Sequence, residues 1–103
     1  MFHRPIHCLL VPLLLAAAAT GARADDIAKG QRLAASHCAG CHAVGPQTRN
    51  VVAASPPFAV IARKYGFDAG RIATAMAGPH PKMNFSPSPN EAADIAAYIA
   101  TLK

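Results

Sequence analysis

Two cysteines followed by a histidine form the part of this sequence with the clearest chemistry. Cys38 and Cys41 are separated by two residues and His42 follows directly, in the pattern C-x-x-C-H. At the end of a helix, two thiols at this spacing can reach the two vinyl groups on one edge of a porphyrin, and the adjacent imidazole then comes under the iron. The pattern therefore predicts covalent attachment of one c-type haem, which would hold the cofactor on a chain too small to enclose it.

Three other kinds of site use closely spaced cysteines. A thiol–disulfide oxidoreductase places C-x-x-C in a βαβ unit, and this chain shows no such alternation of strands and helices. Zinc could be held by Cys38, Cys41 and His42 together with His37, but structural zinc sites usually take two ligand pairs from separated segments. A plain disulfide is the third alternative. Haem attachment is the interpretation that the pattern favours most.

The first 24 residues have the features of a secretory leader. Arg4 precedes an unbroken apolar run over residues 8–19, and Ala22-Arg23-Ala24 provides an A-x-A cleavage site. A membrane-spanning helix needs about 20 apolar residues, so the run is too short for one, although an uncleaved N-terminal anchor remains the alternative. We expect residues 1–24 to be a signal peptide that is cleaved after Ala24, and residues 25–103 to form one domain in the periplasm.

Length and composition exclude several classes of protein. The chain has 103 residues, with ten Lys and Arg against five Asp and Glu, a formal charge of +5 and no Trp. Large enzymes with a separate substrate domain, multidomain receptors and membrane transporters are excluded by size. Without residues 1–24 the chain has eight Lys and Arg against five Asp and Glu, a formal charge of +3. This charge is mild, and the sequence has no Lys/Arg run with interleaved aromatics, so we expect no nucleic-acid partner. Many apolar residues after the leader are small alanines, which indicates that something else completes the core.

The pattern of apolar residues, glycines and prolines predicts an all-α domain of about four short helices. The first is expected to run to about His37 with Asp25 or Asp26 as its cap, and the others to cover residues 58–65, 69–77 and 89–102. Asp68 is the expected cap of the third helix, and Ser88 with Glu91 predicts a capping box at the fourth. The two long connections, residues 43–55 and 79–88, are unusual in so small a domain and indicate a function.

The chain resembles a known family, the class I monohaem c-type cytochromes, in its small bacterial form. The resemblance covers residues 26–103 and rests on GQRLAASHCAGCH at 30–42, SPPF at 55–58, PHPKMNF at 79–85 and DIAAYIATL at 94–102. It implies a cytochrome c fold, in which about four short helices wrap around one haem c bound covalently through Cys38 and Cys41. His42 would then be the proximal iron ligand.

The resemblance also implies a second axial ligand. Family members of this type carry a methionine about forty residues after the histidine, commonly in a K-M-x-F context, and Met83 stands in the segment Lys82-Met83-Asn84-Phe85. Met76 is a rival, but its place in an expected helix is more typical of a core residue. His80 would give a bis-histidine haem, but it is held between two prolines. We therefore expect His42 and Met83 to bind the iron.

Further residues are expected to position the haem. In the family, a proline carbonyl accepts a hydrogen bond from the second ring nitrogen of the proximal histidine, and Pro56 is our choice, with Pro57 as the alternative. Tyr65 either donates a hydrogen bond to a haem propionate or packs in the core, and Phe85 is expected to lie against the haem edge. Family members also cross their first and last helices through a glycine and two aromatics; the corresponding positions here are Gly30, Tyr98 and, in place of one aromatic, Ala34.

An iron with two axial ligands has no vacant position for dioxygen or peroxide, so the resemblance implies electron transfer and not an enzyme. We expect a periplasmic carrier of single electrons between larger redox proteins (a dehydrogenase, reductase or oxidase) that meet the exposed haem edge, with no stable membrane insertion after leader cleavage. A cytochrome subunit bound tightly to a periplasmic dehydrogenase is the alternative, and a haem sensor or peroxidase would need an open sixth position. The cations expected to steer partners are Lys82, Lys64 and Arg49.

Overall fold

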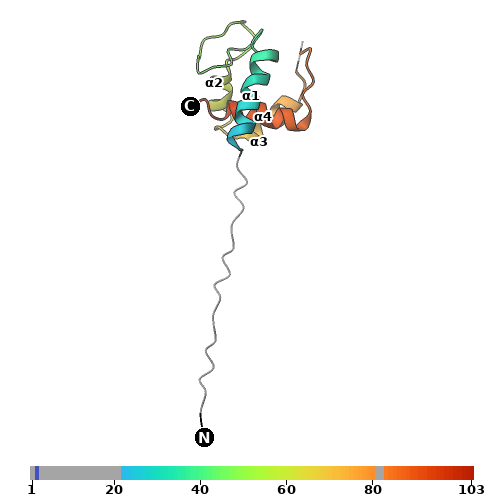
Figure 1. The fold of residues 1–103 in the computed structure, drawn as a ribbon. Helices are drawn as coiled ribbons and strands as arrows, with labels where there is room; N and C mark the ends of the chain where they lie inside the picture. The colour runs from blue at the N-terminus through green and yellow to red at the C-terminus, as the bar shows by residue number, and fades with distance from the viewer. Residues whose placement is uncertain (1, 3–21, 81–82) are drawn as a thin grey trace.

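Four short helices make up the folded part of the chain, in a computed structural model that describes residue 2 and residues 22–80 and 83–103. They are α1 (Ala24–His37), α2 (Phe58–Lys64), α3 (Ala69–Ala77) and α4 (Pro89–Ile99) (Figure 1). No strand occurs within these ranges, where Val52 and Ser55 form only an isolated bridge. The all-α prediction is therefore confirmed. The apolar run of the expected leader, together with Lys82, lies outside the described residues.

The predicted helix caps are correct at α3 and α4 and wrong at α1. Asp68 accepts a hydrogen bond from the backbone N–H of Arg71 at 2.9 Å, and both bonds of the capping box between Ser88 and Glu91 are present. Neither Asp25 nor Asp26 caps α1, because the helix already begins at Ala24 and the two carboxylates lie inside its first turn. Negative charge is still favourable there, next to the unpaired N–H groups of the helix.

The ends of α2 and α4 also differ from the expectation. α2 ends at Lys64, one residue early, and α4 ends at Ile99, so Leu102 lies beyond the last helix. After α2, Gly66 and Phe67 both adopt positive φ angles of 64° and 58°. Their backbone N–H groups bond back to the carbonyls of Arg63 and Ala62, which terminates the helix.

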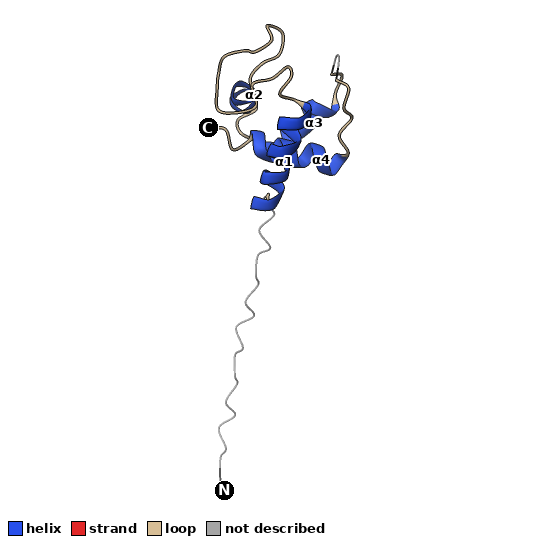
Figure 2. Cartoon of the chain, turned by 45° about the horizontal axis from the view of Figure 1, so that its top comes forward, coloured by secondary structure: helices blue, strands red, loops and turns tan. Residues whose placement is uncertain are grey.

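α1 and α4 cross in direct backbone contact (Figures 1 and 2). A Cβ atom placed on Gly30 would overlap the carbonyl oxygen of Asp94, so only glycine allows the two helices to approach this closely. Ala34, one turn further along α1, is completely buried. Lys29 and Asp94 form a 3.8 Å ion pair at the edge of the crossing. Small residues thus set the distance between the two helices.

The core lies along α4, against which the other three helices pack. Its largest fully buried side chains are Ile72, Ile95, Ile99 and Pro57. The connections from α1 to α2 and from α3 to α4 both lie toward the C-terminal end of α1, where His37 is the last helical residue (Figures 1 and 2). This end of the domain is where the chemistry predicted from the sequence should be found. Within the described residues, none of the helices has the length and apolar character needed to cross a membrane.

Candidate haem site

The C-x-x-C-H segment continues directly from the end of α1. The backbone N–H of Cys38 bonds to the carbonyl of Ala34 at 2.9 Å, and those of Cys41 and His42 turn back to the carbonyl of Cys38 at 3.2 and 2.9 Å. This tight turn keeps the two sulfurs and the imidazole together at one end of the helix. Both cysteines are free thiols, with Cys38 half-buried and Cys41 exposed, so both are available for a covalent bond.

The state of these side chains argues against the alternative sites. Burial raises the pKa of the Cys38 thiol, whereas the attacking cysteine of a redox C-x-x-C motif has a lowered pKa. Zinc finds no support either, because no three His, Cys, Asp or Glu side chains of residues 22–80 and 83–103 come together as a metal site. The free thiols also exclude a disulfide between Cys38 and Cys41 in this structure.

One hydrogen bond fixes the orientation of the His42 ring. Its Nδ1 lies 2.6 Å from the carbonyl oxygen of Pro56. A carbonyl can only accept, so the proton belongs to Nδ1, and Nε2 keeps the lone pair with which a histidine binds a metal. Of the two prolines considered, Pro56 is thus the one whose carbonyl contacts the ring, while Pro57 is buried at the start of α2. The Phe58 ring packs beside the imidazole, with centroids 5.3 Å apart.

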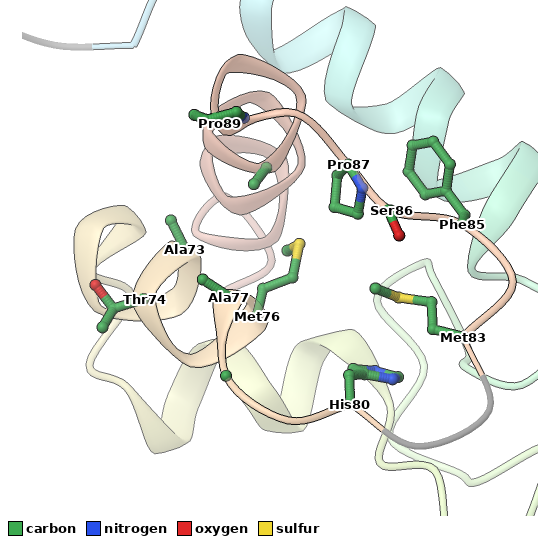
Figure 3. A pocket seen from close by; sticks show the side chains of 12 residues that line it. Ala73, Thr74, Met76, Ala77, His80, Met83, Phe85, Ser86, Pro87 and Pro89 are labelled. Carbon is green, nitrogen blue, oxygen red and sulfur yellow. The ribbon is translucent and has the colours of Figure 1, made fainter.

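The connection from α3 to α4 lines a cavity of about 570 Å³. Met83 enters it from this connection and Met76 enters it from α3, so that the two thioethers approach from opposite sides (Figure 3). His80 also lines the cavity, and its ring centroid lies 6.0 Å from that of His42. All three residues considered for the sixth position are therefore gathered here. Met83 is half-buried, whereas His80 is exposed.

Phe85 lines the same cavity and also packs against α1 (Figure 3). Its ring stacks on the imidazole of His37, with centroids 3.8 Å apart and an angle of 7° between the planes. This contact was not predicted from the sequence, where His37 was considered only as a zinc ligand, because the two residues are far apart in the chain. The one feature of the sequence that could have drawn attention to His37 is its position directly before Cys38.

Tyr65 packs against the core, which was one of the two alternatives considered for it. Its ring lies beside the core cluster, and the charged groups of Lys64 and Arg71 lie 5.5 and 5.8 Å from its centroid. Arg71 also donates a hydrogen bond to the backbone carbonyl of Tyr65 at 3.4 Å. The core-packing alternative is therefore present in the structure, and a bond from the hydroxyl to a haem propionate stays a prediction.

Two of the three cations expected to steer partners can be placed. Arg49 is exposed and lines a second cavity of about 400 Å³ together with His42 and Val51. Lys64 is exposed at the end of α2. Lys82, the third cation, falls outside the described residues. Arg49 and Lys64 are both accessible to a partner, and their part in steering stays a prediction.

Comparison with known proteins identifies the family. The sequence model of the cytochrome c family matches residues 27–103, which include nearly all of the helical domain. The chain belongs to the cytochrome c family. It is 37% identical over 102 residues to cytochrome c-552 of Bradyrhizobium diazoefficiens, in an alignment that covers 98% of each chain. No solved structure matches the chain significantly. The resemblance found from the motifs is thus confirmed.

Cytochromes c carry electrons and bind haem c covalently, and the residues of this chain fit that group. Cys38 and Cys41 are free to form the two thioether bonds. Because Nδ1 of His42 bonds to Pro56, Nε2 keeps the lone pair that can bind a metal. The nearby cavity offers mainly apolar side chains, which suit a porphyrin face, and a neutral sulfur on Met83. These side chains are therefore those that a haem needs when it is attached through two cysteines and bound by a histidine.

Proposed function

We propose that this protein is a periplasmic monohaem cytochrome that carries single electrons between larger redox proteins, with His42 and Met83 as the axial ligands of its haem c. The hydrogen bond from His42 to the carbonyl of Pro56 carries the proposal, because it leaves Nε2 as an oriented lone-pair donor. The entry of Met83 into the cavity supports it as the second ligand (Figure 3). Export with cleavage of residues 1–24 belongs to the same proposal.

The side chains around the site determine how it would work. When bound, haem c supplies reversible one-electron exchange at its iron. The neutral, soft thioether of Met83 favours ferrous over ferric iron and so raises the reduction potential. The Pro56 carbonyl fixes the ring and makes His42 a more basic ligand. The Phe58 ring packs beside His42 and so supports the position of the imidazole.

A freely diffusing carrier is favoured over a subunit held permanently by a dehydrogenase. Within residues 22–80 and 83–103, the exposed large hydrophobic side chains are Val51 and Val52, which are 65% and 42% exposed. A permanent interface needs a much larger apolar patch than two valines. We therefore expect short-lived encounters with partners, and with both axial positions filled we expect no substrate turnover.

The two methionines of the cavity provide a direct test. Met83→Ala removes the proposed ligand, and Met76→Leu is the matched control, because both thioethers enter the same cavity. The proteins are produced in a host with haem-maturation machinery and examined by absorption spectroscopy and redox titration. Wild type and Met76→Leu should be low-spin and show a methionine–iron charge-transfer band when oxidised. Met83→Ala should lose the band and move to a lower potential, within the range of about 0.8 V that axial ligands control.

Several results would contradict the proposal. Colourless wild-type protein would exclude the haem, and an unchanged spectrum in Met83→Ala would exclude Met83 as a ligand. Loss of the band in Met76→Leu alone would assign the ligand to Met76. Rapid binding of carbon monoxide by the ferrous wild type at neutral pH would indicate an open sixth position, as in a sensor or peroxidase.

A further inference from the structure

A parallel ring stack joins the end of α1 to the connection that carries Met83. The His37 imidazole and the Phe85 phenyl ring lie with centroids 3.8 Å apart and planes only 7° from parallel. His37 is the last residue of α1 and directly precedes Cys38. Phe85 follows Met83 by two residues. The stack thus links the segment that carries both cysteines to the one that carries the proposed sixth ligand.

Within the described residues, the packing of residues 83–87 against the core cluster runs through Phe85. Among the described residues, none of the backbone hydrogen bonds outside the helices involves residues 83–87. The next fixed point after Met83 is the capping box at Ser88. Phe85 is the residue of 83–87 that packs against the core cluster, and its ring also stacks on the His37 imidazole. Phe85 is therefore the described packing contact closest in the chain to Met83 on its C-terminal side.

We propose that His37 is a positioning residue that holds the Met83 thioether in the haem site by stacking on Phe85. This inference rests on the proposed role of Met83 as the sixth ligand. A ligand on a loosely held segment leaves the iron more often, and a competing ligand in solution then binds more readily. The stack would keep that exchange slow, and the iron would stay closed to small molecules.

The test compares three substitutions at neighbouring positions of α1. His37→Ala removes the stack, His37→Phe restores an aromatic ring without the imidazole nitrogens, and Ser36→Ala is the control at an exposed residue next to it. The measurements are the methionine–iron charge-transfer band of the oxidised holoprotein and the rate at which added imidazole displaces the sixth ligand. Aromatic pairs have energies that correspond to roughly a 3- to 10-fold effect on an equilibrium or rate. We expect His37→Ala to bind imidazole faster by about that factor, and His37→Phe and Ser36→Ala to behave like the wild type.

The outcomes separate this inference from the proposed function. A wild-type protein without the charge-transfer band would overturn the His42/Met83 ligation itself. If the wild type has the band but His37→Ala binds imidazole at the wild-type rate, the role of His37 is wrong while the ligation stands. Equally fast binding in His37→Ala and His37→Phe would overturn the stack as the cause. A guanidinium unfolding midpoint for each variant shows whether the ligand is lost without loss of the fold.

Discussion

The hydroxyl of Tyr98 donates a hydrogen bond of 2.5 Å to the backbone carbonyl of Val44. Tyr98 belongs to α4 and is buried, and Val44 lies two residues after His42. The last helix therefore holds the chain just after His42, while the Pro56 carbonyl holds the imidazole ring itself. Burial also raises the pKa of the Tyr98 hydroxyl, which keeps it a hydrogen-bond donor over the whole neutral range.

Tyr98→Phe tests this hydrogen bond between α4 and Val44. The variant keeps the ring in the core but leaves the Val44 carbonyl without this partner. Removal of one member of a partly buried hydrogen bond costs about 1 to 3 kcal/mol. We expect guanidinium unfolding of the holoprotein to show a loss of that size in the free energy of unfolding. The dependence of this free energy on guanidinium concentration should not change. An unfolding curve that coincides with the wild type would show that the bond contributes nothing to the fold.

Gly30→Ala tests the close crossing of α1 and α4. Alanine normally stabilises a helix interior relative to glycine by about 0.5 to 1 kcal/mol. Here the added methyl group would overlap the carbonyl oxygen of Asp94, so the helices must separate. We expect a net destabilisation of about 1 to 3 kcal/mol in thermal or denaturant unfolding. Gln31→Ala, at the next and exposed position of α1, is the control and should change stability little; a stabilised Gly30→Ala would contradict the contact.

Glu91 gives the fold a dependence on pH in the acid range. Hydrogen bonds from the backbone and the side chain of Ser88 hold the pKa of the Glu91 carboxyl below its ordinary value. A carboxyl with a lowered folded pKa stabilises the fold above its unfolded pKa, about 4.3, and loses this contribution as the pH falls through the folded pKa. Glu91→Gln can still accept the capping bond but has no charge. We expect the variant to be less stable than the wild type near neutral pH and equally stable in strong acid, as measured by urea unfolding at a series of pH values. A stability difference that stays constant with pH would contradict this.

The proposed cleavage of the leader sets the mass that we expect for the mature protein. Cleavage after Ala24 should give a polypeptide of residues 25–103 plus one haem in the periplasmic fraction, measured by intact mass spectrometry. This cleavage would remove Arg23, whose carbonyl accepts the first backbone bond of α1 from Ile27 at 3.1 Å, and would leave Asp25 and Asp26 at the new terminus. A mass that includes residues 1–24 would instead support the uncleaved anchor.

Local patterns were sufficient for most of the helices and for the chemistry of the haem segment. C-x-x-C-H predicts its cofactor because two thiols for the vinyl groups and one imidazole for the iron lie within five residues and need no distant partner. The caps at Asp68 and Ser88 were predicted correctly for the same reason, since each side chain bonds to the backbone three residues further on. The predicted cap of α1 was wrong because two adjacent aspartates offer equivalent signals, and a carboxylate is also favourable inside the first turn.

The sequence by itself determined the cofactor class, the family and the all-α fold, since these depend on residue types at fixed short spacings. Only the tertiary structure decided which proline carbonyl contacts the imidazole of His42. The two prolines are adjacent and have the same local sequence context. They differ only in how each carbonyl lies relative to the His42 ring, which is fourteen residues away from Pro56. The tertiary structure also brought His37 onto Phe85 and Gly30 onto Asp94. Such pairs form where separate segments pack together, and no short-range pattern records which residues will meet there.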